Sequence, residues 1–388
     1  VAGVSFRNEL FDGIDTSWKR IPGGAAVGAL VADLQQNFRY DHPAGSLGQL
    51  LAIRSALQKI DDPRAKEKMT EVDEAIALVT GLWLEARAAR PAAVPGTELG
   101  VQLIAVNRSD VRVSLSAAAL VASSGRHTIE SLPAQLTGNE EKTFSTRYRI
   151  APSEPYSQPY WLRLGPEEAR YQVADPTVIG RPENGPWLEA RFEVEIEGQK
   201  IEYRRPVEYY EVDPQIGEKR RPLALVPPVS VEMTEPVVLF RETKPRALDV
   251  RLQATAQPVA GVLRLETPAG WRAGPDTREV ALETAGEQSL ARFTVTPPAG
   301  PSDVSVRAAA GAAGKSVSDT VRVIEDPHIP PQTVLLPALA RVIRADVVTL
   351  AQNVGYIMGA GDEVPKALEQ LGCRVTLLDD AQIAQGDL

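Results

Sequence analysis

The chain has 388 residues, of which 43% are hydrophobic and 24% are charged, so its composition is that of ordinary globular proteins and its length indicates two to four domains. A formal net charge of −9 and the absence of a long basic run argue against a nucleic-acid partner. One cysteine, Cys373, excludes an intrachain disulfide, and no apolar run reaches the roughly 18–20 residues that a membrane span needs.

Residues 1–92 are expected to form a helical appendage. Apolar residues recur at helical spacing over 23–38, over a segment that Ser46 begins, and over a third that runs from Pro63 to about Ala89. A serine N-cap and a proline in the first turn are typical helix starts. DHPAG (41–45) places Asp41 and His42 together, but a turn between two helices explains it better than a metal site.

The hydrophobic period changes to strand-like alternation near residue 93. Strands are expected on both sides of a turn at 107–110, and again over 142–150, 161–164, 188–197 and 200–207. Phe192, Val194 and Ile196 alternate with charged residues, and Gly198-Gln199 predicts a hairpin. We therefore expect a first antiparallel β-sandwich over residues 93–227.

A second sandwich is expected over residues 228–326, after the linker-like Pro227-Pro228. Short strands recur between Pro/Gly turns, at 229–233, 247–254, 261–266, 278–282, 290–295, 303–309 and 316–324. The spacing of these strands is short and regular, and a sandwich of about one hundred residues is immunoglobulin-like in size. Two tandem sandwiches make the expected fold multidomain and mainly β.

Residues 327–388 are expected to contain a linker, 328–347, and the first β-α-β unit of an α/β domain. In NVGYIMGAGDEVPKALEQLGCRVTLLDD (353–380), a strand, a tight turn, a helix and a second strand follow one another. The turn lacks the third glycine of a dinucleotide fingerprint, and Asp362 and Glu363 would repel phosphate. One β-α-β unit cannot bury a parallel sheet, so we expect the chain to be a piece of a longer protein.

The chain shows no catalytic or metal-binding motif. His42, His127 and His328 lie in three different segments, and no H-x-x-H, C-x-x-C, P-loop or G-x-S-x-G sequence occurs. Cys373 begins a predicted buried strand and is interpreted as a core residue. We therefore assign no catalytic, cofactor-binding or metal-binding residue to this chain.

Aromatic residues on sandwich loops are the remaining candidates for a binding site. Trp161 and Tyr160 lie in PYSQPYWLRLG, and Trp187 lies in RPENGPWLEARF. Exposed rings can stack on sugars, so these three are candidate glycan contacts. A structural role remains the favoured interpretation for Trp161 and Trp187, and more strongly for Trp271, because sandwiches often bury such rings.

Four stretches, in matching order, resemble the downstream part of large bacterial PIG-L (LmbE-like) family deacetylases. They are FDGIDTSWKRIPGG (11–24), GLWLEA (81–86), RFEVEIEGQKIEYRRPVEYYEVDPQIGEKRRPLALVPPVSVEM (191–233) and GYIMGAGDEVPKALEQLG (355–372). The resemblance implies a preceding zinc-dependent catalytic domain that de-N-acetylates acetamido sugars, and a final glutamine-amidotransferase-like α/β domain. The family's H-P-D-D and H-x-x-H motifs are not in this sequence, so no catalytic residue or zinc ligand is carried over.

The resemblance implies that this chain is the non-catalytic accessory region of such an enzyme and is inactive alone. Its expected partners are the catalytic and amidotransferase-like domains of the same protein, with glycan as a possible ligand. Export to the periplasm is favoured over the cytoplasm. A carbohydrate-binding sandwich independent of any deacetylase and a purely structural spacer remain open alternatives.

Overall fold

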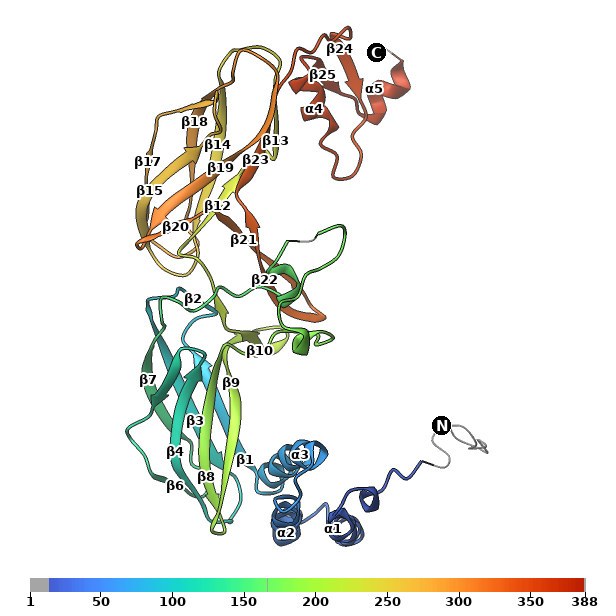
Figure 1. Cartoon of the computed structure of the whole chain (residues 1–388), viewed down its shortest axis with the longest axis vertical. Coiled ribbons are helices and arrows are strands. Elements are labelled where there is room, and N and C mark those ends of the chain that lie inside the picture. The colour runs from blue at the N-terminus through green and yellow to red at the C-terminus, as the bar shows by residue number, and fades with distance from the viewer. Residues whose placement is uncertain (1–13, 166, 387–388) are drawn as a thin grey trace. The chain divides into compact units, whose positions relative to one another are not determined.

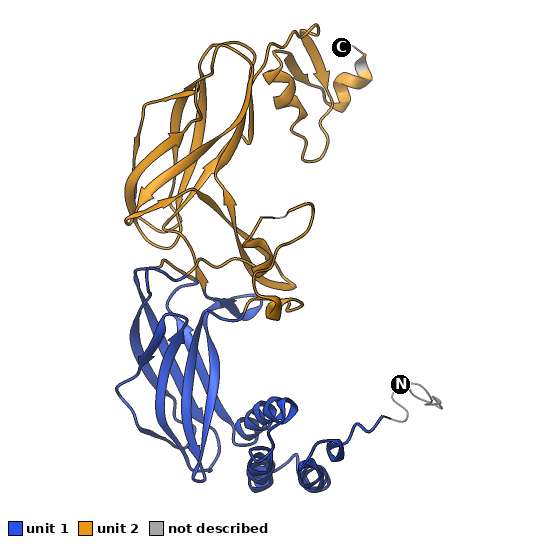
Figure 2. Cartoon of the chain, viewed as in Figure 1, with its two compact units in different colours: residues 1–91, 96–154, 185–223 blue, residues 92–95, 155–184, 224–388 orange. Residues whose placement is uncertain are grey.

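A computed structural model describes residues 14–165 and 167–386 of the chain, which is mainly β (Figure 1). The chain forms two compact units, shown in blue and orange in Figure 2. The first comprises residues 1–91, 96–154 and 185–223, and the second comprises residues 92–95, 155–184 and 224–388.

The first unit begins with three helices, α1 (Gly24–Asn37), α2 (Leu47–Leu57) and α3 (Pro63–Val79), with 3-10 turns at Trp18–Arg20 and Pro43–Ser46. They share a small core that includes Val27, Ile53 and Leu57. Pro63 opens α3 as predicted, and Asp62 caps it by accepting a hydrogen bond from the Arg64 backbone at 2.9 Å. Ser46 stands at the N-cap of α2 as predicted, but its backbone is helical and its side chain forms no capping bond.

Helix α3 ends ten residues earlier than the predicted end near Ala89. The Thr80 hydroxyl donates to the carbonyl of Ile76 at 2.7 Å, and Gly81 follows with φ of 60°, a left-handed helix end. Residues Leu82–Ala88 then form strand β1. In this stretch the alternation of side chains favours a strand over continued helix.

A nine-stranded sheet makes up the rest of the first unit. Its order is β5-β4-β8-β9-β1-β3-β7, with β10 on β9 and β6 on β4. All pairs are antiparallel except β1 with β9. The strands besides β1 are β3 (Glu98–Asn107), β4 (Val113–Ala122), β5 (Gly125–Thr128), β6 (Ala134–Leu136), β7 (Lys142–Arg149), β8 (Leu188–Ile196), β9 (Gln199–Asp213) and β10 (Gly217–Pro222).

The sheet curls until it nearly closes on itself. The Asn107 side chain, at the end of β3, donates to the carbonyl of Leu136 in β6 at 3.1 Å. Phe192, Val194 and Ile196 of β8 are fully buried inside, which confirms the predicted half-buried strand. The β8–β9 hairpin is also confirmed, with Glu197 and Gly198 at its tip.

The second unit contains two sheets that share one core, which includes Val231, Phe293, Leu263, Val306 and Val342. One sheet has the order β12 (Val229–Met233), β14 (Arg246–Ala254), β18 (Gln288–Thr296) and β16 (Arg272–Gly274). The other has the order β13 (Val237–Phe240), β23 (Leu339–Arg344), β19 (Ser302–Ala312), β15 (Val259–Glu266) and β17 (Arg278–Leu282), with β20 (Lys315–Val317) on β19. Short strands β2 (Ala92–Ala93) and β11 (Ala224–Leu225) pair in parallel.

The predicted linker over 328–347 is wrong, because it contains two strands. Strand β22 (Ile329–Pro337) forms a two-stranded ribbon with β21 (Asp319–Asp326), and β23 lies between β13 and β19 with Ala340 and Val342 fully buried. The prolines of this segment lie in β22, which pairs on one side only and tolerates missing donors. A predicted strand over 161–164 is also wrong: Tyr160–Leu162 is a 3-10 turn, and a second such turn is Pro176–Val178.

The C-terminal β-α-β unit is confirmed. Strands β24 (Asn353–Tyr356) and β25 (Arg374–Leu377) are parallel and are joined by α4 (Val364–Gln370), after which α5 (Asp380–Gln385) follows. Asp362 accepts a hydrogen bond from the Val364 backbone at 2.9 Å. Gly372, with φ of 91°, follows α4 and ends it in the left-handed conformation.

Candidate ligand-binding face

Strand β1 has one buried and one outer row of side chains. Leu84, Ala86 and Ala88 face the core, whereas Trp83, Glu85 and Arg87 follow the alternate positions on the outer side. Trp83 is 36% exposed, but Glu85 is only 3% exposed. The outer row therefore holds a carboxylate that its neighbours shield from water.

Two further strands add aromatic and charged side chains to this outer side. Strand β9 places Glu208 opposite Arg87, and β10 places Arg220 opposite Tyr210. Trp83, Glu208, Tyr210 and Arg220 line a common pocket. Residues far apart in the sequence thus meet on one face of the sheet.

The rings and guanidinium groups of this face form an alternating ladder. The Arg108 guanidinium lies 5.4 Å from the centroid of the Trp83 ring, and that of Arg220 lies 5.5 Å from Trp83 and 5.0 Å from Tyr210. The Arg87 guanidinium lies 4.7 Å from the Tyr210 ring. Each contact is attractive because the ring face carries negative charge, and together they hold both rings in fixed positions.

The two carboxylates of the face differ in their partners. Glu85 accepts a hydrogen bond from the Trp83 indole N–H at 2.9 Å and pairs with the Arg87 Nε. Within residues 14–165 and 167–386, the Glu208 carboxylate forms no hydrogen bond or ion pair, although it is half-buried. Glu208 is therefore available to accept hydrogen bonds from a ligand.

Burial alters the proton affinity of this cluster. It raises the pKa of Glu208; the Arg220 charge opposes the rise and the Glu85 charge adds to it. Burial also raises the pKa of Tyr210 to about 12, so its hydroxyl keeps its proton at neutral pH and can donate a hydrogen bond.

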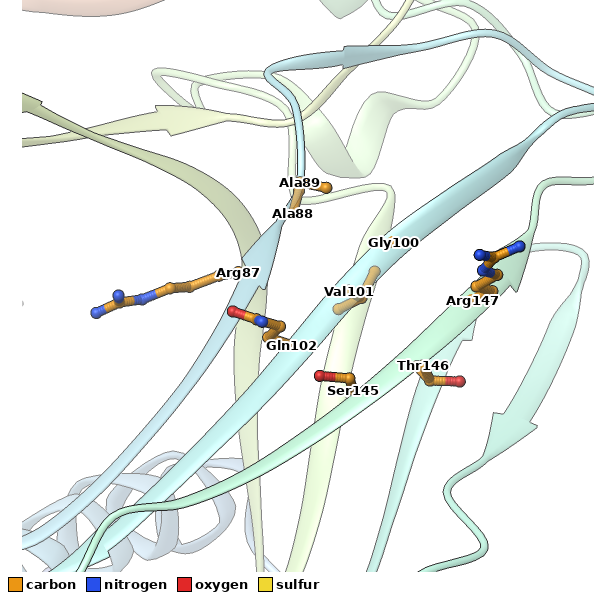
Figure 3. A pocket seen from close by; sticks show the side chains of 9 residues that line it. All are labelled: Arg87, Ala88, Ala89, Gly100, Val101, Gln102, Ser145, Thr146 and Arg147. Atoms are coloured by element: carbon orange, nitrogen blue, oxygen red, sulfur yellow. The ribbon is translucent and has the colours of Figure 1, made fainter.

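Two pockets lie along this part of the sheet. The first, of about 250 Å³, is lined by Trp83, Glu85, Glu208, Tyr210 and Arg220, with Leu78 of α3 at its border. The second, of about 680 Å³, is lined by β1, β3 and β7 and includes Arg87, Gln102 and Ser145 (Figure 3). Since Glu85 lines the first pocket and its partner Arg87 lines the second, the pockets are neighbours.

A row of polar side chains crosses four strands at this level. The strand register aligns Glu208 of β9 with Arg87 of β1, Arg87 with Gln102 of β3, and Gln102 with Ser145 of β7. Figure 3 shows the Arg87, Gln102 and Ser145 side chains projecting to the same side of the sheet. The row offers both hydrogen-bond donors and acceptors.

The aromatic residues singled out in the sequence lie elsewhere. Trp187 is half-buried, donates to the Leu223 carbonyl at 2.9 Å and packs near Tyr148. Trp161 and Tyr160 stack edge to face at 4.8 Å in the second unit, where the Tyr160 hydroxyl bonds the Arg181 carbonyl at 3.2 Å. Their contact with glycan stays a prediction.

Trp271 has the structural role that its sequence favoured. It is 3% exposed, and its indole N–H donates to Ser302 at 3.1 Å. Cys373 is likewise a buried, free thiol. In DHPAG, Asp41 pairs with Arg39 at 2.6 Å and remains exposed.

The sequence analysis did not name four residues of this face as candidate ligand contacts: Trp83, Glu85, Glu208 and Tyr210. The expectation of a helix through about Ala89 concealed the period-two alternation of LWLEARA. That alternation was the available signal, because it places Trp83, Glu85 and Arg87 on one polar face. Their meeting with β9 and β10 had no local signal.

Within the described ranges, no three His, Cys, Asp or Glu side chains are grouped so that they could hold a metal ion. Among the same residues, no helix is both long and apolar enough to cross a membrane.

Comparison with known proteins shows only distant structural similarity. No protein-family model matches the chain, and no curated protein matches it. The native conformation of Escherichia coli alpha-2-macroglobulin aligns with 68% of this chain and 16% of its own, at 10% identity and a TM-score of 0.23. Salmonella alpha-2-macroglobulin reacted with methylamine aligns over the same shares, at 11% identity and a TM-score of 0.22.

A family 123 glycoside hydrolase from Clostridium perfringens is a further structural neighbour. It aligns with 34% of this chain and 30% of its own, at 7% identity and a TM-score of 0.19. This chain spans about a sixth of the length of the two macroglobulins, 16% in each case. Similarity at these TM-scores does not define a shared fold.

Proposed function

We propose that this chain is a non-catalytic accessory region that binds glycan on the outer face of β1, β3, β7, β9 and β10. We propose further that its parent is a PIG-L family de-N-acetylase, for which the four sequence stretches given above are the support. In that arrangement the two β units act as spacers and binding modules, the second of them with an immunoglobulin-like fold, and the C-terminal β-α-β unit begins an amidotransferase-like domain.

The observation that carries glycan binding is the ring ladder beside the two pockets. A sugar ring has apolar C–H faces, which pack on aromatic rings, and hydroxyl groups around its edge, which bond to planar polar side chains. Trp83 and Tyr210 provide the rings, and Glu208 and Gln102 provide polar groups next to them. The guanidinium groups hold the rings in place before a ligand arrives, which reduces the entropy lost on binding.

The test is binding of the full chain to a glycan array, followed by calorimetric titration of the glycans retained. Trp83→Ala and Tyr210→Ala should each weaken binding by about tenfold or more, because each removes a stacking ring. Tyr40→Ala is the matched control, because Tyr40 is 92% exposed on the helical part of the same unit. It should bind as the wild type does.

Trp83→Phe separates loss of the ring from loss of the fold, because it keeps a ring but cannot donate to Glu85. If it binds glycan while Trp83→Ala does not, stacking is responsible. Retention that survives both alanine variants and disappears in Trp187→Ala or Trp161→Ala would move the site to the loops. No retention on any glycan would leave the chain a structural spacer.

A further inference from the structure

We infer that the glycan is a neutral, extended oligosaccharide that lies across the strands and occupies both pockets, and not a single terminal sugar. This inference rests on the proposed function and specifies its ligand. The length of the polar row, the adjacency of the pockets and the charge balance of the face carry it.

The length of the row favours several sugar units. Neighbouring strands lie about 4.8 Å apart, so the three steps from β9 through β1 and β3 to β7 span roughly 14 Å. Glu208, Arg87, Gln102 and Ser145 occupy that span at one level of the sheet. A single ring could contact only neighbouring members of the row.

Arg87 lines the larger pocket and pairs with Glu85, which lines the smaller one. Its Nε pairs with Glu85 at the border of the smaller pocket, and its guanidinium stacks on Tyr210. Its side chain also lines the larger pocket, beside Gln102 (Figure 3). A chain of sugars that stacks near Trp83 and Tyr210 can therefore continue along Gln102 to Ser145, where β7 ends the sheet order.

The charge balance of the face favours a neutral ligand. Its acids and bases form four ion pairs: Glu85 with Arg87, Glu74 with Arg205 at 2.7 Å, Glu218 with Arg220 at 3.2 Å, and Glu98 with Arg147 of the larger pocket at 3.9 Å. One carboxylate, Glu208, and one guanidinium, Arg108, remain near the rings. Since neither sign is in excess, hydroxyl and amide groups satisfy this face better than a charged group does.

The experiment measures affinity against chain length, with N-acetylglucosamine and its β-1,4-linked dimer to hexamer as probes and the full chain as the protein. Affinity should rise about tenfold or more from monomer to trimer and then level off, because the row is then filled. Gln102→Ala and Ser145→Ala should weaken binding of the trimer several-fold and leave weak monomer binding unchanged.

Thr143→Ala is the matched control, since Thr143 is exposed on the same strand as Ser145 but outside the pocket lining. It should leave every affinity unchanged. Equal affinity for all chain lengths, or an insensitive Gln102→Ala variant, would overturn this inference and leave the proposed function standing. Failure of all lengths to bind would overturn the inference, and the glycan array would then decide the proposed function separately.

Discussion

Two carboxylates on one sheet face differ because their surroundings differ. Glu85 is buried but bonded to Trp83 and Arg87, so its charge is compensated and it serves to hold the ladder. Glu208 is half-buried and has no such partner in the described part of the chain, so burial raises its pKa and the nearby Arg220 charge offsets only part of the rise. At the residue scale, Glu208 is therefore the group that should make ligand binding depend on pH.

Glycan affinity of the wild type should fall as pH falls through the raised pKa of Glu208. Above that pKa the carboxylate accepts hydroxyl hydrogen bonds at full charge, and below it the protonated group accepts them weakly. The charged and titratable groups around it are Glu85, Arg220, Arg87 and Tyr210; burial raises the pKa of Tyr210 to about 12, and the Glu85 hydrogen bond raises the pKa of Arg87.

Titrations of the wild type and of Glu208→Gln between roughly pH 4 and pH 8 test this expectation. The variant should bind several-fold more weakly at neutral pH and show a flat profile. A variant that keeps the acid loss of affinity would show that Glu208 is not the group responsible.

At the element scale, the boundary between α3 and β1 determines whether Trp83 faces outward. Gly81 adopts φ of 60°, and a Cβ at this position would lie 3.0 Å from the Cβ of Arg108. Both facts make glycine the residue that lets the chain leave the helix and enter the sheet.

Gly81→Ala should destabilise the protein by about 1–2 kcal/mol, because an L side chain strains the left-handed conformation. Gly48→Ala, in helix α2, should instead stabilise it by about 0.5–1 kcal/mol, because no atom lies within 4 Å of the added Cβ and alanine favours helix. Urea unfolding of both variants measures the difference. The same sign for both would show that backbone conformation does not govern Gly81.

Strand β23 lies in the segment 328–347 that was predicted to be a linker, although its own burial pattern is that of a strand. Ala340, Val342 and Arg344 are buried at alternate positions, which is a strand signal. The prolines before it belong to β22, an element with only one paired edge. Proline indicates where a backbone donor is unused and does not by itself indicate a linker.

At the scale of the whole molecule, two compact units with separate cores should unfold as two cooperative transitions. Leu103→Ala should lower the free energy of unfolding of the first unit by about 2–5 kcal/mol, since its side chain is fully buried. Leu263→Ala should lower that of the second unit by a similar amount, for the same reason. Each substitution should therefore lower the midpoint temperature of one transition. Differential scanning calorimetry of the two variants measures this. If both substitutions shifted one common transition, the units would be energetically coupled.

Local patterns in the sequence were sufficient for the mainly β composition, the half-buried strand β8, the β8–β9 hairpin and the C-terminal β-α-β unit. Each of these depends on side-chain alternation or on turn residues within a few positions, so the sequence alone contains their cause. The burial of Trp271 and of Cys373 followed from the same kind of reasoning.

Only the tertiary structure decided which strands are neighbours, and with that the candidate site. The parallel pairing of β1 with β9 brings Trp83, Glu85 and Arg87 beside Glu208 and Tyr210. Such pairing depends on how completely the whole sheet buries its inner face. A short segment of sequence therefore cannot predict it. The sequence alone therefore determines the residue types and the strand periods. The face on which those residues meet is determined only by the tertiary structure.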